Sequence, residues 1–222
     1  MKKIFAIFAF LCAAVINIQA ERVFVGAEQT KLYLPLLKGK RVALLSNHTG
    51  IVIQGTDTIH TLDLLLKHGV EVTAIFSPEH GFRGTAREGE HVASSVDAKT
   101  GIPILSLYDG KSQRPSKEAM QTFDILITDI QDVGLRFYTY YVTMFRLMNA
   151  CASEGKQFMV FDRPNPNGFY VDGPILDMKH KSGVGALPIP VVHGMTLGEL
   201  AQMINGENWL NDSMKVDLTV IP

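Results

Sequence analysis

The stretch Val70-Glu71-Val72-Thr73-Ala74-Ile75-Phe76, followed at once by Ser77-Pro78-Glu79-His80-Gly81-Phe82-Arg83-Gly84, organises the rest of the chain. The first part is a mostly apolar run with the length of a buried strand. The second part contains a proline and two glycines, which favour an irregular turn over a helix start. Open α/β sheets bind their ligands in turns at the carboxyl ends of strands. We therefore expect a functional site here, with Glu79 as a candidate catalytic acid.

Similar apolar runs recur along the chain and alternate with stretches of helical period. We expect further strands at residues 41–46, 103–108, 124–130 and 157–161, and helices at 57–68, 117–122, 140–154 and, behind a capping box at 196–199, up to 204. Uniformly apolar strands that alternate with helices are typical of a parallel sheet covered on both faces. The sequence thus predicts the α/β class, with a Rossmann-like, doubly wound, mainly parallel sheet. With the five strands numbered along the chain, the expected order is 3-2-1-4-5.

The first twenty residues have the pattern of a secretory leader. Lys2 and Lys3 precede a nearly continuous apolar run at 4–18, and a small residue closes the segment at Ala20. We predict a signal peptide at 1–20, a catalytic domain at 21–222 and export to the periplasm. Cys12 raises the alternative of a lipoprotein, although the residues before it are bulkier than a lipidation site prefers.

Composition and absent motifs narrow the possible functions. Removal of the leader shifts the formal net charge from -1 to -3, and no basic patch occurs, which argues against a nucleic-acid partner. The remaining cysteine, Cys151, is expected to be a buried thiol without a disulfide partner. Dinucleotide, zinc-protease and serine-hydrolase signatures are missing, and Gly110-Lys111-Ser112 lacks the first glycine of a phosphate-binding loop at Leu105. We expect no cofactor and no metal.

Polar residues follow nearly every predicted strand. They are Asn47 and His48 after the first strand, Glu79, His80 and Arg83 after the second, Asp129, Gln131, Asp132 and Arg136 at the fourth, and Asp162, Arg163 and Asn165 after the fifth. Such residues at one edge of a sheet define a polar cleft. Some of them can instead cap helices or form turns: Asn47 and His48 are open between turn formation and ligand binding, and Asp162 is expected to orient its neighbours.

Glu79 and Asp129 form the pair that most suggests a reaction. In the expected strand order their strands flank the first strand, so the strand ends lie roughly 10 Å apart. Inward-pointing side chains shorten this to the roughly 6.5–9.5 Å that separates a general acid from a base that activates water in glycosidases. Asp129 and Asp132 with His80 could alternatively hold a divalent cation. Tyr138 is open between stacking on a sugar and core packing, and His193 is open between binding and structure.

Four motifs together resemble one known family. They are 77–84, quoted above, Asp129-Ile130-Gln131-Asp132-Val133-Gly134-Leu135-Arg136-Phe137-Tyr138-Thr139-Tyr140, Asp162-Arg163-Pro164-Asn165-Pro166 and His193-Gly194-Met195-Thr196-Leu197-Gly198-Glu199-Leu200. Their order and spacing are similar to those of the NamZ-type exo-β-N-acetylmuramidases, long catalogued as a domain of unknown function. The likeness spans residues 40–205.

The resemblance implies a Rossmann-like domain followed by a second, smaller carboxyl-terminal domain, with the active site between them. This chain stops soon after a strand pattern begins at 217, so we expect it to be truncated before that second domain. The implied activity releases N-acetylmuramic acid from the non-reducing ends of peptidoglycan fragments without a nucleotide cofactor. Glu79 matches the proposed catalytic glutamate of the family. The cleft residues implied by the motifs are Asn47, His80, Arg83, Asp129, Arg136, Tyr138, Arg163, Asn165 and His193, to which Asp132 is added as a substrate-binding residue.

The residues suit such a substrate. Muramic acid carries a lactyl carboxylate, which Arg83, Arg136 or Arg163 could grip through two parallel hydrogen bonds. Its acetamido group also permits a route in which the substrate carbonyl attacks the anomeric carbon and Asp129 orients the acetamide. Retaining and inverting routes stay open. The expected partners are muropeptides or disaccharides from peptidoglycan. Two rival functions are a non-catalytic muropeptide- or sugar-binding module and a metal-assisted hydrolase.

Overall fold

A computed structural model of the chain describes residues 22–78, 82, 94–107 and 114–222. Within these ranges the chain forms a seven-stranded sheet in the order β5-β6-β4-β1-β7-β8-β9. The strands are β1 (Arg41–Ser46), β4 (Glu71–Ser77), β5 (Ser95–Val96), β6 (Pro103–Ser106), β7 (Ile125–Asp129), β8 (Gln157–Phe161) and β9 (Asp217–Ile221). Every neighbouring pair is parallel except β5 with β6. The predicted order of the five expected strands is confirmed, because they appear as β6-β4-β1-β7-β8.

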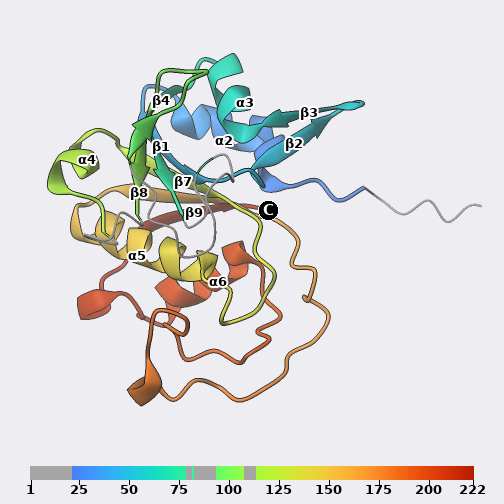
Figure 1. The fold of residues 1–222 in the computed structure, drawn as a ribbon, viewed down its shortest axis with the longest axis vertical. Coiled ribbons are helices and arrows are strands. Elements are labelled where there is room, and N and C mark those ends of the chain that lie inside the picture. Colours follow the sequence, from blue (N-terminus) through green and yellow to red (C-terminus); the bar gives the residue numbers. More distant parts are fainter. Residues whose placement is uncertain (1–21, 79–81, 83–93, 108–113) are drawn as a thin grey trace, which may run out of the picture.

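Helices cover both faces of this sheet (Figure 1). On one face α2 (Thr30–Leu37) and α3 (Thr61–Lys67) pack over strand residues such as Leu44. On the other face α5 (Tyr140–Ser153) and α6 (Leu197–Gly206) pack over residues such as Leu45, with α4 (Lys117–Gln121) beside them. Successive residues of a strand point to opposite faces, so a strand covered on both sides must be apolar throughout. This is why the strands read as continuous apolar runs in the sequence.

The helix predicted at 57–68 is only partly correct. Residues Asp57–His60 form a strand, β3, which pairs antiparallel with β2 (Ile51–Gln54), and α3 begins only at Thr61. Gly55, with a φ of 65°, allows the tight turn between the two strands. The Nδ1 atom of His60 then accepts a hydrogen bond from the Leu62 N–H at 3.1 Å and caps the new helix. The hairpin extends away from the sheet next to α2 and α3 (Figure 1).

The remaining helices agree well with expectation, except for the unpredicted α2. The capping box at Thr196 and Glu199 opens α6, as the sequence pattern indicated. Cys151 is buried in α5, as expected, and burial raises the pKa of its thiol to about 12. Short 3₁₀ turns occur at Gly26–Glu28 (η1), Met178–His180 (η2) and Asn211–Ser213 (η3). In the described part of the chain, no helix combines the length and apolar character needed to cross a membrane.

A long segment between β8 and α6 has little regular structure apart from η2. It extends from the sheet edge and passes below α5 and α6 in Figure 1. Isolated bridges join Val192 to both Leu135 and Asp172, so the segment is tied to the loop that follows β7. We call residues 166–190 the loop lobe. Of residues 83–100, only 94–100 belong to the described part, and they contain β5.

Candidate active site

The carboxyl ends of the central strands lie level with one another. Ser46 at the end of β1 pairs with Asp129 at the end of β7, and Ser77 at the end of β4 pairs with Ser106 at the end of β6. The loops that leave these strands therefore start from one edge of the sheet. This is the edge where open α/β sheets bind ligands, and it is where the sequence placed its candidate residues.

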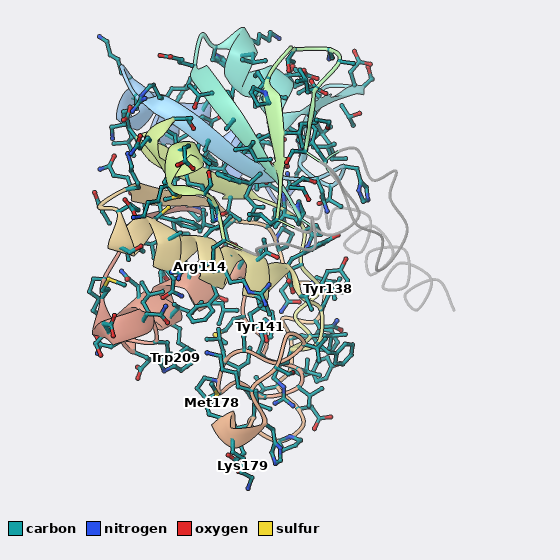
Figure 2. All side chains as sticks on the ribbon, turned by 60° about the vertical axis from the view of Figure 1, so that its left-hand side comes forward. Arg114, Tyr138, Tyr141, Met178, Lys179 and Trp209 are labelled. Atoms are coloured by element: carbon teal, nitrogen blue, oxygen red, sulfur yellow. The ribbon has the colours of Figure 1, made fainter. Side chains whose placement is uncertain are left out.

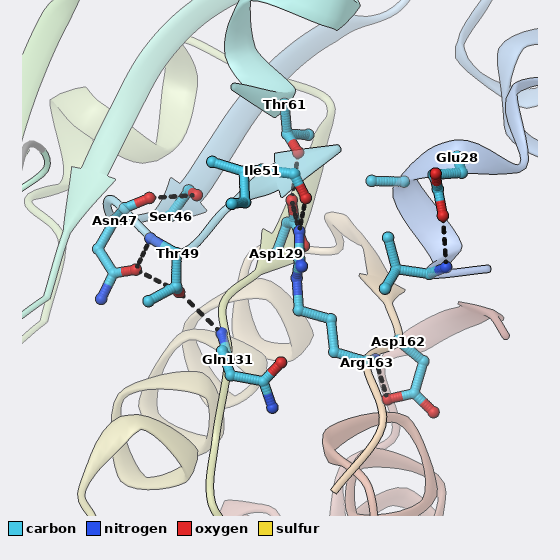
Figure 3. Close-up of polar contacts among 12 residues, drawn as sticks. Glu28, Ser46, Asn47, Thr49, Ile51, Thr61, Asp129, Gln131, Asp162 and Arg163 are labelled. Carbon is cyan, nitrogen blue, oxygen red and sulfur yellow. Dashed lines mark hydrogen bonds and ion pairs between the residues drawn. The ribbon is translucent and has the colours of Figure 1, made fainter. Parts of the chain in front are cut away.

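A buried ion pair joins two of the predicted site residues (Figure 3). The Nε of Arg163 donates to Asp129 Oδ1 at 2.6 Å, and its Nη2 donates to Oδ2 at 3.1 Å. The hydroxyl of Thr61 also donates to Asp129 Oδ2. Arg163 Nη2 further donates to the Ile51 carbonyl at 3.0 Å. The Asp129 carboxylate thus joins the ends of β7 and β8 to the start of α3, and Arg163 joins them to the hairpin.

Asn47 forms the turn that follows β1. Its side-chain oxygen accepts hydrogen bonds from the Thr49 N–H at 2.9 Å and from the Thr49 hydroxyl at 2.6 Å, which is an Asx turn. Its amide nitrogen donates to the Tyr140 hydroxyl at 3.0 Å. Thr49 Oγ1 in turn accepts from the Gln131 N–H at 3.0 Å, which joins the β1 loop to the β7 loop (Figure 3). The turn-forming alternative therefore describes Asn47 well, and its ligand-binding role stays a prediction.

Asp132 has one satisfied and one unsatisfied oxygen. Oδ1 accepts from the Gly134 N–H at 2.8 Å, whereas Oδ2 is buried with no hydrogen-bond partner among the described residues. The residue is only 7% exposed. Loss of water raises the pKa of this carboxyl from 3.8 to about 6, although nearby backbone N–H groups, Gly134 first, act in the opposite direction. A ligand group that donates a hydrogen bond would complete its pairing.

His193 also has one satisfied and one unsatisfied ring nitrogen. Its ring is 4% exposed, and Nδ1 accepts a hydrogen bond from the Met195 N–H at 3.3 Å. An accepting Nδ1 places the proton of the neutral ring on Nε2. Burial lowers the pKa of His193, which favours this neutral form at pH 7. Nε2 is buried, and its N–H group finds no acceptor in the described part of the chain.

Gly134 brings the loops of these two residues together. Its carbonyl accepts from the His193 N–H at 3.2 Å, and its N–H binds Asp132. The φ of Gly134 is 72°, and an added Cβ would lie within 2.6 Å of three atoms of the Asn165 amide. Asn165 itself donates to the Met195 carbonyl at 2.9 Å. The structure thus joins Asp132, Asn165 and His193 in one group of loops, and it tests none of their binding roles.

Arg136 and Tyr138 lie where the β7 loop meets α5. Arg136 Nη1 donates to the carbonyls of Pro174 and Ile189 at 2.7 Å each, which fastens the loop lobe to this edge. Tyr138 is 36% exposed and packs edge-on against Tyr140, with ring centroids 4.9 Å apart. Figure 2 shows Tyr138 near the amino end of α5. The Tyr138 ring is thus partly exposed, and its stacking role stays a prediction.

Asp162 orients its neighbours, as expected. Its Oδ2 accepts from the Thr196 hydroxyl at 2.6 Å, and its Oδ1 accepts from the Gly198 N–H at 2.8 Å. A Cβ at Gly198 would lie 2.6 Å from the Asp162 carboxyl carbon, so glycine allows this close approach. The carboxylate thereby anchors the amino end of α6 to the end of β8.

Three predicted site residues, Glu79, His80 and Arg83, lie outside the described residues. Their roles, and the separation predicted between Glu79 and Asp129, stay predictions. Within the described ranges no group of three His, Cys, Asp or Glu side chains is placed to hold a metal ion. The alternative cation site includes His80, so it stays a prediction.

Sequence reasoning missed Thr61 and Tyr140 as partners of the site. Thr61 was assigned to the interior of a helix, whereas it is the first residue of α3 and contacts Asp129. The glycine at 55 between two β-branched stretches was the available signal for the hairpin, and hence for the later helix start. Tyr140 was assigned to the helix alone, and its hydroxyl contact with Asn47 had no signal in the local pattern.

Comparisons with known proteins identify relatives of this chain. A family model described as the N-terminal part of exo-beta-N-acetylmuramidase NamZ matches residues 42–222. Over 191 residues the chain is 47% identical to the peptidoglycan beta-N-acetylmuramidase NamZ of Bacillus subtilis. The matched region covers 85% of this chain and 44% of that protein.

Two crystal structures of DUF1343 family proteins from Bacteroides fragilis have the same fold. One is 60% identical with a TM-score of 0.79, and the match covers 91% of this chain and 52% of that one. The other is 37% identical with a TM-score of 0.82, and the match covers 92% of this chain and 50% of that one. The chain therefore spans about half the length of the relatives that it matches. The resemblance of the four motifs is confirmed, and the chain belongs to the NamZ family, whose amino-terminal domain it matches.

Proposed function

We propose that this protein is an exo-acting glycoside hydrolase that releases N-acetylmuramic acid from the non-reducing ends of peptidoglycan fragments. The observation that carries the proposal is the polar edge of the sheet. It contains the buried Asp129–Arg163 pair and two buried polar atoms without a described partner, Asp132 Oδ2 and His193 Nε2. The name of the Bacillus subtilis relative supplies the substrate class.

Glu79 is the proposed general acid. The strand β4 ends at Ser77, level with the ends of its neighbours, and Glu79 follows two residues later in the chain. In both retaining and inverting glycosidases a carboxylic acid protonates the leaving-group oxygen. The end of β4 at this edge of the sheet, two residues before Glu79, supports that role for Glu79.

Asp132 and His193 are proposed to bind the sugar. The Oδ2 atom of Asp132 can accept a hydrogen bond from a ligand, and the Nε2–H group of His193 can donate one to it. Sugar hydroxyls and the acetamido group both donate and accept, so they suit this combination. A buried polar atom without a partner costs about 1–3 kcal/mol, and a ligand that pairs with it recovers that energy.

Asp129 stays the proposed second functional carboxylate, and its contacts support a positioning role. Its oxygens already accept three hydrogen bonds, two from Arg163 and one from Thr61. A carboxylate held in this way is well suited to orient a neighbouring group. This favours the substrate-assisted route, in which Asp129 orients the acetamide directly or through Arg163, over direct activation of water.

The lactyl carboxylate is proposed to bind Arg83 or Arg136. Arg163 uses Nε and Nη2 for Asp129, and Arg136 uses Nη1 for two backbone carbonyls. Arg163 has therefore committed the Nε–Nη2 pair that a two-bond grip uses, whereas these contacts of Arg136 leave its Nε–Nη2 pair to a ligand. Arg83 lies outside the described residues, and its place in the motif at 77–84 supports it as the other candidate.

Export and a role in cell-wall recycling belong to the same proposal. The leader pattern at 1–20 supports secretion across the inner membrane, and peptidoglycan fragments are a substrate of that compartment. Amino-terminal sequencing of the protein recovered from a periplasmic extract is the measurement. A chain that begins after Ala20 is expected, and an intact leader on the soluble protein would contradict export.

The test uses the full-length protein and a chromogenic N-acetylmuramide. We expect turnover that survives a chelator and is lost, by at least about a hundredfold, in Glu79→Gln, because general acid catalysis contributes about 10²–10⁴-fold. Glu71→Gln is the matched control, since Glu71 is an exposed residue at the opposite end of β4. Its activity should equal that of the wild type.

The same assay separates the rival functions. Binding of the muramide without turnover, measured by calorimetry, would favour the binding module. Turnover that disappears with chelator and returns with a divalent cation would favour the metal-assisted hydrolase. Equal activity of Glu79→Gln and wild type would remove Glu79 from the mechanism.

A further inference from the structure

A cavity of about 410 Å³ lies along one side of α5, away from the sheet edge. Its lining comes from α5, from the loop lobe near Lys181, from Arg114 before α4 and from Asn211 in η3. Figure 2 shows Arg114 beside the middle of α5, whereas Tyr138 lies near the amino end of this helix. The volume is within the range of small-molecule sites, which is about 300–1,000 Å³.

The charged residues in the described part of the lining are all cationic. Three cationic residues, Arg114, Arg146 and Lys181, come from three separate segments, and no described residue of the lining is Asp or Glu. Neither Arg146 nor Lys181 has an ion pair with any residue that the structure describes. By contrast, Lys179 on the same loop is paired with Asp177 at 2.7 Å and does not line the cavity.

The walls are held by contacts within the protein. The ammonium group of Lys181 lies over the Phe145 ring, 5.7 Å from its centroid, which keeps this flexible side chain at the cavity. Asn149 Oδ1 accepts from the Asn211 N–H at 2.7 Å and fixes the opposite wall to α5. Tyr141 accepts a hydrogen bond from the Ala186 N–H at 3.1 Å and fixes the loop lobe. The two cations therefore project from supported segments.

We propose that this cavity binds a small organic anion that carries at least two carboxylate or phosphate groups. The guanidinium of Arg146 matches the geometry of either group, and the Lys181 ammonium supplies a second point charge. Two cations in a concave site whose described lining contains no acidic residue lower the energy of an anion more than cations on an open surface do. The site is separate from the polar edge of the sheet and does not depend on the proposed hydrolase function.

The test is calorimetric titration of the protein with citrate and, separately, with tripolyphosphate. Both probes carry several anionic groups, and the preferred probe identifies the carboxylate or the phosphate class. We expect one-to-one binding that weakens as salt rises from about 50 mM to about 500 mM, because added ions screen exposed charges. Each of Arg146→Gln and Lys181→Gln should weaken binding about tenfold, since each removes one charge-assisted contact to the anion.

Lys179→Gln is the matched control. It removes the same charge from the same loop but leaves the lining unchanged, so binding should stay within about twofold of the wild type. Lys181 is exposed, so its variant tests the site without a risk to folding. Absence of binding to both probes would overturn the proposal. Equal weakening by Lys179→Gln and Lys181→Gln would also overturn it, because the effect would then be one of general surface charge.

Discussion

Asp129 and Asp132 lie three residues apart at the end of β7, and both are buried, yet their surroundings differ. Asp129 accepts three hydrogen bonds and faces the guanidinium of Arg163. Asp132 has no described cation beside it, and one of its oxygens is unpaired. Burial alone therefore does not indicate what a carboxylate does. The number and charge of its partners separate a residue that holds the site together from one that is available to a ligand.

The difference has an energetic meaning. A buried ion pair contributes little to stability compared with an apolar pair, but removal of one partner leaves an uncompensated charge. An unpaired buried carboxylate instead avoids the cost of desolvation by keeping its proton, which is why its pKa rises. The two aspartates should consequently respond to mutation in opposite directions.

The largest expected effect comes from the paired carboxylate. Asp129→Leu should lower the free energy of unfolding by about 3–5 kcal/mol, because Arg163 stays buried without a counter-charge. Urea denaturation followed by circular dichroism measures this loss. The double variant Asp129→Leu with Arg163→Met should recover part of it, since both charges are then absent. A double variant as unstable as the sum of the single variants would show that the pairing is not the cause.

The unpaired carboxylate predicts a pH effect of smaller size. The pKa of Asp132 is about 6 in the folded protein against an ordinary 3.8, so the folded state binds the proton more tightly. Its contribution to stability is complete below about pH 4 and is lost as the pH rises through 6. Asp132→Asn removes this loss, so its stability relative to wild type should rise by up to about 3 kcal/mol between pH 4 and pH 7.

Asp124 supplies a control of opposite sign. Hydrogen bonds from Arg41 lower the pKa of this exposed carboxyl to about 2, so its stabilising effect is present above pH 3.8 and is lost as the pH falls through 2. Asp124→Asn should therefore become less stable relative to wild type as the pH rises. If Asp132→Asn followed the same trend, the Asp132 carboxyl would be paired.

Binding of the muramide should weaken in Asp132→Asn even though the fold is stabilised.

The comparison also shows what the sequence could and could not predict. The strand order followed from apolar runs, because a sheet covered on both faces requires them. Asp129 and Asp132 both come at the end of a predicted strand, so the sequence placed them at the same edge of the sheet. It did not distinguish their surroundings. The partner of Asp129 is Arg163, 34 positions away, and the contact depends on two loops whose course no local pattern specifies.

The hairpin was missed for a related reason. Ile59, Leu62, Leu65 and Leu66 have helical spacing, so the pattern extended the helix to Asp57. The backbone instead pairs with β2, and tertiary hydrogen bonds override the local preference. The shift places Thr61 at the start of α3, where its hydroxyl reaches Asp129.

The smallest expected effect tests that hydroxyl. Thr61→Val removes a donor to Asp129 while it keeps the side-chain shape, so one carboxylate oxygen loses a partner in a buried site. We expect a loss of about 1–2 kcal/mol in the free energy of unfolding. The control is Thr128→Val, one residue before Asp129, because the Thr128 hydroxyl is buried and has no partner among the described residues. Removal of an unpaired hydroxyl should be neutral or stabilising. A larger loss of unfolding free energy in Thr61→Val than in Thr128→Val would therefore show that Asp129 depends on its hydrogen bonds. Equal losses in both variants would mean that side-chain volume, and not hydrogen bonding, decides stability at this edge of the sheet.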